Sequence, residues 1–182
     1  MQELNCSIEI KKNLDENEKK RVLEINKSNL AKNGGQLHYE GILNHDFVVL
    51  VKHQGVVVAY SLLTESFLTK DDLYVMQIAV DNNFKHLGIG AKMYNYTYNH
   101  LKDYRYFTAN VNASNKISQA FHKKCGFNLV GVNNLGLIYV KPVEKTVALG
   151  LSDANKESFD IKKSKTELIN EEMTSTKDFL EK

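Results

Sequence analysis

"VDNNFKHLGIGAKMYNYTYNHL", residues 80–101, follows a run of apolar residues and places Gly88 and Gly90 one residue apart before a helix-like sequence. Glycines between a strand and a helix leave backbone N–H groups uncovered, and the helix dipole adds partial positive charge at the same place. The stretch therefore predicts a binding site for an anion, above all for a phosphate group.

The known phosphate-binding loops differ from this one in spacing. A Rossmann dinucleotide loop needs a third glycine where this chain has Met93, and it opens the fold instead of following several strands. The P-loop pattern G-x-x-x-x-G-K-[ST] does not occur in the sequence. A helix start that uses glycine only for its turn stays open as the alternative interpretation.

Strands and helices are predicted to alternate around this loop. Period-two and β-branched apolar runs indicate the strands, and residues 72–80, apolar on both faces, indicate a central strand. The expected strands are residues 6–11, 46–52, 56–63, 72–80, 104–111, 127–132 and 135–141, and the expected helices are residues 16–32, the segment after Gly88, and 114–127.

Local signals mark the helix ends. Asp15 and Glu18 form a capping-box pattern, and Gly34 with Gly35 is expected to end the first helix. In the helix over 114–127, the side chains expected to point inward are Ile117, Ala120 and Phe121, with Gly126 as its stop. The segment 36–45 is ambiguous between a short helix and a loop.

Composition limits the class of protein. The 182 residues are 42% hydrophobic and 25% charged with a net charge of +2, which fits one domain and gives no sign of nucleic-acid binding. Cys6 and Cys125 lack the spacing of metal ligands, so no metal is expected. Because neither a signal peptide nor a run of membrane-spanning length is present, we expect a cytoplasmic protein with no membrane partner.

The loop resembles the pyrophosphate motif of the GNAT superfamily of acetyl-CoA-dependent N-acetyltransferases, Gln/Arg-x-x-Gly-x-Gly/Ala after a central strand. Here Lys85 stands at the Gln/Arg position, followed by Gly88 and Gly90. The departures are Lys85 itself, Asn82 where proline is frequent, and Phe84 for the usual tyrosine. All of them are compatible with phosphate binding, because main-chain amides hold the phosphates in this motif and a lysine is still a cation.

A second motif supports the resemblance. Family members often carry Asn-x-x-Ala-x-x-hydrophobic-Tyr-x-x-x-Gly-Phe in the next helix, and this chain has "NKISQAFHKKCGF", residues 115–127. Ser118 takes the alanine position and His122 the tyrosine position. The two motifs occur in the family's order, and the resemblance covers roughly residues 5–142.

The resemblance implies an α/β (α+β) fold of the GNAT type. Its central mixed, mostly antiparallel twisted sheet has about six to seven strands flanked by helices, and it splays between the fourth and fifth strands. The implied GNAT acetyltransferase domain is residues 1–143. Residues 144–182 are then a charged C-terminal extension, expected to be partly helical or flexible.

The resemblance also implies where acetyl-CoA, the cosubstrate, would bind. Its pantetheine arm would lie between the splayed strands and its pyrophosphate on the glycine loop, mostly through main-chain atoms. Asn115 would contact the pantetheine arm, although helix capping is an equally physical role for it. The implied cofactor-binding residues are Ile78, Ala79, Val80, Lys85, His86, Leu87, Gly88, Ile89, Gly90, Ala91 and Asn115.

Two side chains are the catalytic candidates. His122, at the family's tyrosine position, could protonate the leaving coenzyme A thiolate, or it could be an ordinary helix residue. Tyr74 lies in register with a strand glutamate that some members use as base, but a buried strand tyrosine is more often core. Gln77 lies on the same strand, where some members hold a water.

The expected function is transfer of acetyl from acetyl-CoA to a primary amine by direct attack in a ternary complex. The acceptor would be a small-molecule amine or a protein amine, and the enzyme could be a homodimer. The alternative is a non-catalytic acyl-CoA-binding module of the same fold, acting as a sensor or partner protein.

Overall fold

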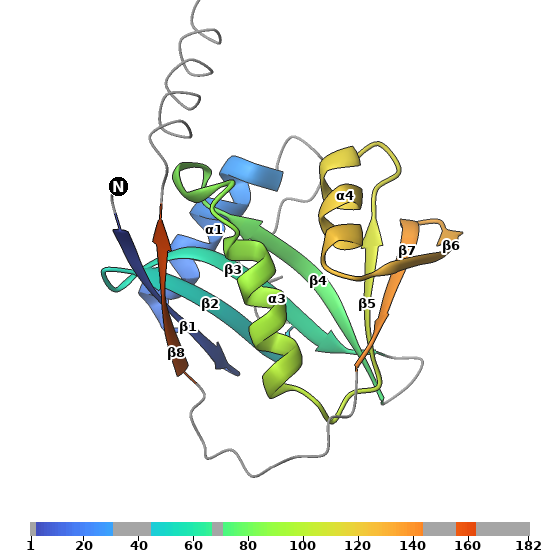
Figure 1. Cartoon of the computed structure of the whole chain (residues 1–182), viewed down its shortest axis with the longest axis horizontal. Helices are drawn as coiled ribbons and strands as arrows, with labels where there is room; N and C mark the ends of the chain where they lie inside the picture. Colours follow the sequence, from blue (N-terminus) through green and yellow to red (C-terminus); the bar gives the residue numbers. More distant parts are fainter. Residues whose placement is uncertain (1–2, 31–44, 67–70, 144–155, 163–182) are drawn as a thin grey trace, which may run out of the picture.

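A computed structural model of the chain describes residues 3–30, 45–66, 71–143 and 156–162. The strands in these ranges form one sheet, and the helices lie against its faces (Figure 1). In chain order the elements are β1 Glu3–Lys11, α1 Glu16–Leu30, β2 Phe47–His53, β3 Val56–Glu65, β4 Asp72–Val80, the 3₁₀ helix η2 Asn82–Phe84, α3 Ile89–His100, β5 Tyr106–Val111, α4 Lys116–Lys124, β6 Asn128–Asn133, β7 Gly136–Pro142 and β8 Lys156–Lys162.

The sheet has the mixed, mostly antiparallel character that the family resemblance implies. Its strand order is β6-β7-β5-β4-β3-β2-β1-β8, and among these neighbours β4 and β5 alone run parallel. The described residues give eight strands where six to seven were expected. The eighth is β8, in the tail expected to be helical or flexible, and it pairs antiparallel with β1. An open strand edge pairs readily with another strand, but the local sequence does not reveal which segment will pair with it.

The parallel strands β4 and β5 stay together for only part of their length. Four residue pairs join them, from Asp72↔Tyr106 to Val75↔Ala109, while β4 continues to Val80. Figure 1 shows the two strands close together at the bottom and separated toward the top, near α4 and the loop that leads into α3. The splay expected between the fourth and fifth strands is confirmed.

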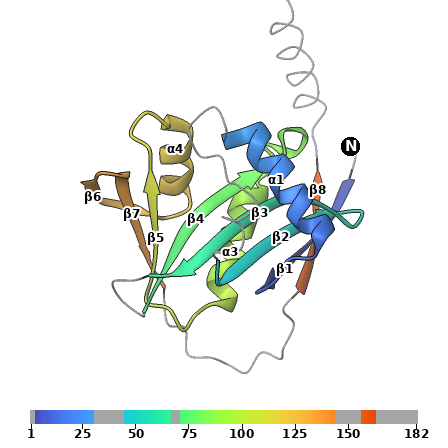
Figure 2. The same cartoon turned by 180° about the vertical axis from the view of Figure 1, so that it is seen from behind.

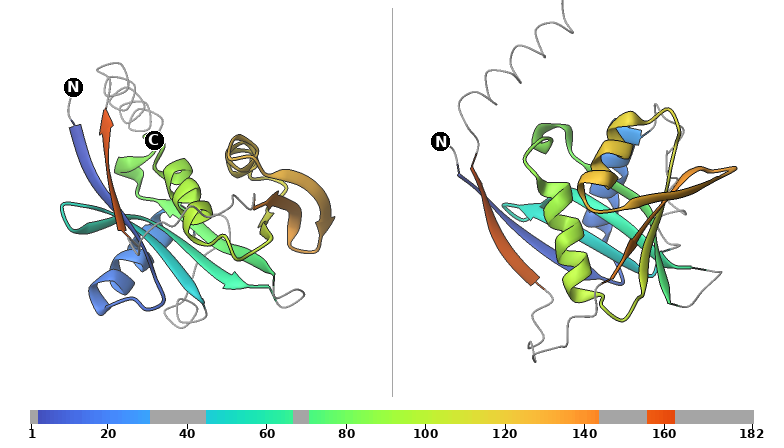
Figure 3. Two further views of the ribbon diagram at one scale, coloured as in Figure 1. Left: turned by 60° about the horizontal axis from the view of Figure 1, so that its bottom comes forward. Right: turned by 45° about the vertical axis from the view of Figure 1, so that its right-hand side comes forward.

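The two faces of the sheet carry separate cores. Helix α1 covers one face, and α3 lies on the opposite face (Figures 2 and 3). Strand residues alternate between faces, so Leu73 and Val75 of β4 pack in the core under α3, whereas Tyr60 and Leu62 of β3 pack under α1. Each helix is thus held by burial of its apolar side on one face of the same strands.

Local signals in the sequence fix several chain turns. Asp15 Oδ1 accepts from the amide of Glu18, and Glu18 Oε2 accepts from the amide of Asp15, both at 2.9 Å, which confirms the capping box. Gln54 and Gly55 have φ angles of 50° and 79° in the predicted β2–β3 hairpin. Gly34, Gly35 and most of the segment 36–45 lie outside the described residues.

Helix α4 buries a different side from the one expected. Ile117 is 85% exposed and Ala120 is exposed as well, so their predicted inward orientation is wrong. His122 is buried instead, and Phe121 and Cys125 pack against the core under α3. The helix is short, and its orientation is decided by the aromatic side chains of α3 and β7 that it meets.

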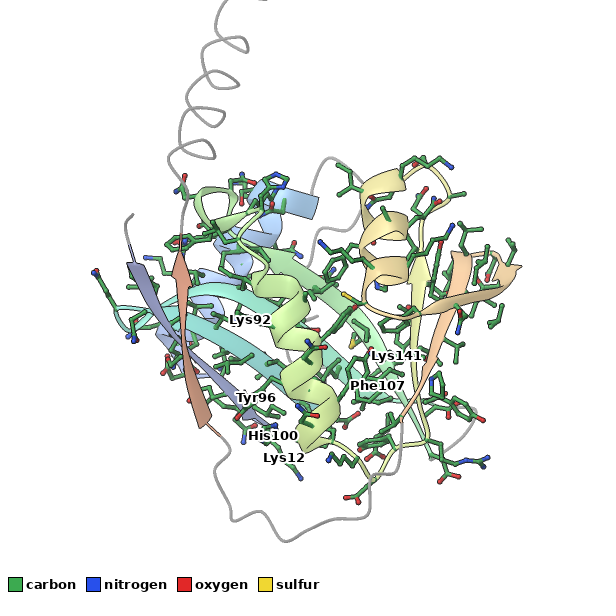
Figure 4. All side chains as sticks on the ribbon, in the orientation of Figure 1. Lys12, Lys92, Tyr96, His100, Phe107 and Lys141 are labelled. Carbon is green, nitrogen blue, oxygen red and sulfur yellow. The ribbon has the colours of Figure 1, made fainter. Side chains whose placement is uncertain are left out.

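Lys141 of β7 joins three of these elements. Its Nζ donates to the Cys125 carbonyl at 2.9 Å, just after α4, and lies 3.7 Å from the ring centre of Tyr98 in α3. Tyr98 also meets Phe107 of β5 edge to face at 4.6 Å. Figure 4 shows Lys141 and Phe107 between α3 and the strands β5 and β7. These contacts fix α3 and α4 on either side of the strand divergence.

Candidate active site

The turn after β4 is held by the side chain of Asp81. Its Oδ1 accepts from the amide of Asn83 at 2.8 Å, and its own amide donates to the Val58 carbonyl at 2.8 Å. Its Oδ2 accepts from the guanidinium of Arg21 in α1. Asp81 is only 8% exposed, so this charge is removed from water and compensated by the arginine. The entry to the glycine loop is therefore tied to β3 and α1.

No side chain caps the N-terminus of α3, so its backbone amides are left uncovered. Gly88 is its cap residue, with φ at 75° in the left-handed region that favours glycine. The amide of Lys92 donates to the Gly88 carbonyl at 3.0 Å, but amides in the first turn of a helix have no intrahelical acceptor. The N–H groups of Ile89, Gly90 and Ala91 are therefore suited to bind an anion, and the helix dipole reinforces them.

Gly90 serves packing as well as the loop. A Cβ placed on it would lie 3.1 Å from two ring atoms of Phe121 in α4, closer than such contacts normally are. A larger residue at this position would push the two helices apart. The second glycine of the pair therefore lets α3 and α4 approach each other beside the divergent strands.

The other predicted loop residues surround this turn. Lys85, Leu87 and Gly90 are half-buried, Gly88 and His86 are exposed, and His86 has a φ of 62° without being glycine. The structure thus brings the expected residues 85–91 together at one helix N-terminus, directly beyond Ile78, Ala79 and Val80 at the end of β4.

A bulge in β4 lies beside the divergence. The register with β3 passes from Leu63↔Val75 to Leu62↔Gln77, which leaves Met76 without an opposite residue. The bulge is held at Gln77, whose carbonyl accepts from Ser61 Oγ at 3.0 Å. Because β4 bends at a bulge, these contacts help to direct Ile78–Val80 away from β5.

The side chain of Gln77 belongs to a polar cluster under α1. Its Oε1 accepts from Asn26 Nδ2 at 2.7 Å and from the Tyr60 hydroxyl at 3.0 Å, while Asn26 also donates to that hydroxyl at 2.9 Å. Burial raises the pKa of Tyr60 to about 12, so this hydroxyl keeps its proton. Gln77 was expected near the site from the sequence, whereas Asn26 and Tyr60 were not, because they come from distant elements.

His122 lies inside the core, 3% exposed. Its Nδ1 donates to the Ser118 carbonyl at 2.8 Å, which leaves Nε2 as the acceptor for the hydroxyl of Tyr94 at 3.0 Å. Burial lowers the pKa of His122, and the hydrogen bond to Ser118 only partly opposes this. Of the two interpretations that the sequence left open, the geometry favours a packed, neutral histidine.

Asn115 and Tyr74 each have a hydrogen-bond partner in the structure. Asn115 caps α4, its Oδ1 accepting from the amide of Ser118 at 3.0 Å, which is the capping role that the sequence left open. The hydroxyl of Tyr74 accepts from Asn110 Nδ2 of β5 at 3.3 Å. Asn110 was not found from sequence, because no motif marks it and only the sheet register brings it to Tyr74.

No group of three or more His, Cys, Asp or Glu side chains within the described residues is arranged to hold a metal ion. None of the helices in these ranges is both long and apolar enough to cross a membrane.

Solved structures of similar fold have low sequence identity. Protein smu.2055 from Streptococcus mutans UA159 aligns with a TM-score of 0.65 and 19% identity over 75% of this chain and 99% of that one. The PaiA N-acetyltransferase of Thermoplasma acidophilum, solved in complex with coenzyme A, gives 0.61 and 15% over 74% and 98%. The ribosomal-protein-S18-alanine N-acetyltransferase of Escherichia coli gives 0.55 and 16% over 80% and 99%. No curated protein sequence matches this chain.

The comparison with family profiles is more direct. The profile described as Acetyltransferase (GNAT) family matches residues 16–127, which run from the start of α1 to the end of the second motif. That span includes the glycine loop, the strand divergence and helix α4. The chain belongs to the GNAT acetyltransferase family.

Proposed function

We propose that the chain is an N-acetyltransferase that moves acetyl from acetyl-CoA to a primary amine by direct attack in a ternary complex. The observation that carries this proposal is the position of the α3 N-terminus, with its first-turn amides, next to the divergence of β4 from β5. The acceptor is a small-molecule amine or the amine of a protein.

The cofactor side of the site uses main-chain atoms. In this proposal the amides of residues 88–91 and the cation of Lys85 bind the pyrophosphate, and His86 and Leu87 shape the turn between them. The backbone of Ile78, Ala79 and Val80 faces the pantetheine arm, and an amide near Ile78 stabilises the oxyanion formed when the amine attacks. Asn115 contacts the arm only if its side chain leaves the cap.

The two proton transfers of the reaction, loss of a proton by the amine and protonation of the leaving thiolate, do not require side chains buried in the core. The attacking amine must be neutral, and the leaving group is a thiolate, whose parent thiol has a pKa of about 8.5 in cysteine. Such a group can leave without an acid, so transfer does not require His122. The predicted roles of His122 as acid and of Tyr74 at the acceptor amine therefore need separate kinetic tests.

Thiol release from acetyl-CoA across a panel of amines tests the function. We expect release that depends on both the enzyme and an amine, with acetylated product of matching amount. Isothermal titration with coenzyme A is run in parallel. Binding without release on any amine would favour the acyl-CoA-binding module, and absence of binding would contradict both functions.

A further inference from the structure

Tyr74 and Asn110 meet at the point where β4 and β5 part. The last residue pair of the two strands is Val75↔Ala109, so Tyr74 comes one residue before this pair and Asn110 one residue after it. Since Val75 and Ala109 face the core under α3, Tyr74 and Asn110 both point to the opposite face of the sheet. There Asn110 Nδ2 donates to the Tyr74 hydroxyl at 3.3 Å.

The amide of Asn110 has one hydrogen-bonding atom left over. Its Oδ1 is buried and has no partner among the described residues. Leaving a buried acceptor unpaired is unfavourable, and each such group in a native protein needs an explanation. Because Tyr74 accepts from the NH₂ group, the amide is oriented with its oxygen available for a donor such as N–H.

We propose that Asn110 Oδ1 accepts a hydrogen bond from the attacking nitrogen of the acceptor, that Tyr74 positions this amide, and that the acceptor is an α-amino group. The inference rests on the proposed acetyltransferase function and adds the class of its acceptor. An N–H of the amine points to Oδ1, and the nitrogen lone pair stays free to form the bond to the acetyl carbon. The C–S bond then breaks, the thiolate leaves, and the nitrogen releases its remaining extra proton to water.

The choice of an α-amino group follows from the chemistry of an amide. An asparagine oxygen accepts a hydrogen bond but does not take up a proton near neutral pH, so this pair orients an amine that is already neutral. At pH 7.5 about a third of α-amino groups with a pKa near 7.8 are neutral, against about one in a thousand lysine side chains with a pKa of about 10.4. The pair therefore suits the amine that supplies more of its reactive form.

Two peptides of one sequence test the acceptor class with the full-length protein and acetyl-CoA. One has a free α-amino group and an acetylated lysine, and the other has an acetylated N-terminus and a free lysine. We expect kcat/KM, measured by thiol release at pH 7.5, to be at least tenfold higher for the free α-amino peptide. Preference for the lysine peptide, or release only with a small diamine, would overturn the α-amino assignment.

Asn110 variants test the pair itself. Asn110→Leu removes the acceptor at similar size and is expected to lower kcat/KM for the peptide at least tenfold, while the dissociation constant of coenzyme A changes less than twofold. Asn110→Asp keeps an oxygen acceptor and should retain most of the activity even where the leucine variant is poorly folded. Tyr74→Phe, which keeps the ring but frees the amide, should lie between them.

The control is Asn99→Leu, the same change at an exposed position of α3, which should leave all constants unaltered. Unchanged kcat/KM in Asn110→Leu, or loss of activity in the aspartate variant equal to that in the leucine variant, would overturn the role of Asn110. If the unmodified protein binds coenzyme A but releases no thiol with any amine, the proposed function fails and this inference fails with it. If the wild-type protein is active and the Asn110 variants are as active as it is, the inference about Asn110 is wrong while the proposed function stands.

Discussion

The glycine loop and helix α4 both match family motifs, yet they act through different atoms. In the loop, the groups proposed to bind the pyrophosphate are the backbone amides that follow Gly88, so we expect Lys85 and Phe84 to replace the usual residues without changing the geometry. In α4, the side chains decide, and His122 in place of tyrosine places a ring inside the core against Tyr94. A motif held by main chain transfers its function more safely than one held by side chains.

The largest effect is expected at the contact between these two regions. Gly90→Trp would place a bulky side chain where even a Cβ comes within 3.1 Å of Phe121, so it should separate α4 from α3 and abolish coenzyme A binding. The measurement is titration calorimetry with a thermal melt of the same sample. As a control, Gly55→Asn in the β2–β3 hairpin should keep binding, because asparagine tolerates the left-handed φ and no atom lies within 4 Å of an added Cβ. Unchanged affinity in Gly90→Trp would contradict the assignment of the loop.

Removal of the Asp81 side chain tests how much the loop depends on its support. Asp81→Ala deletes the acceptor for the Asn83 amide and leaves Arg21 without this partner. We expect roughly tenfold weaker binding of coenzyme A, since the loss of a buried charged hydrogen bond costs about 1.5–3 kcal/mol, part of it in loop order. Glu24→Ala removes the other carboxylate on Arg21, an exposed one, and should have little effect. Equal effects of the two variants would show that the loop holds its shape without Asp81.

His122→Phe separates packing from catalysis in α4. The variant leaves the buried hydroxyl of Tyr94 without its acceptor, so the free energy of unfolding should fall by about 1–3 kcal/mol while kcat stays within twofold. Adding Tyr94→Phe should recover part of that loss, because both polar partners are then gone. A tenfold fall in kcat with unchanged stability would instead support His122 as the proton donor.

The pH dependence of stability gives a second measure of the same histidine. The pKa of His122 lies below its ordinary value of 6.5 because the ring is buried, so the unfolded chain binds the proton more readily. The contribution of neutral His122 to the free energy of unfolding should therefore be fully present above pH 6.5 and should decrease as the pH falls below that value. Denaturant unfolding at several pH values should show a smaller decrease over this range in His122→Phe than in the wild type.

The smallest effect is expected from the one cation of the loop motif. Lys85→Ala should weaken coenzyme A binding about two- to fivefold, because the half-buried lysine is still screened by water and the backbone amides remain. The difference between variant and wild type should shrink as salt rises from 0.05 to about 0.5 M. A loss as large as that in Gly90→Trp would mean that the side chain, and not the backbone, holds the pyrophosphate.

Most of the fold was predictable because its signals are local. The capping box at Asp15 and Glu18, the hairpin at Gln54 and Gly55, and the strands from β2 to β7 depend on neighbouring residues and on short apolar periods. Of the site, the glycine loop was predictable for the same reason. The support that Asp81 gives to it was not, because Arg21 is 60 residues away in sequence.

The sequence alone determined that a glycine-capped helix follows a central strand, because helix caps, turns and strand periods are set by residues within a few positions of one another. The tertiary structure alone decided which side of α4 faces inward, where β4 leaves β5, that β8 lies on β1, and that Asn110 reaches Tyr74. These are contacts between residues far apart in the chain. Their free energy comes from shared burial and register, which no short stretch of sequence contains.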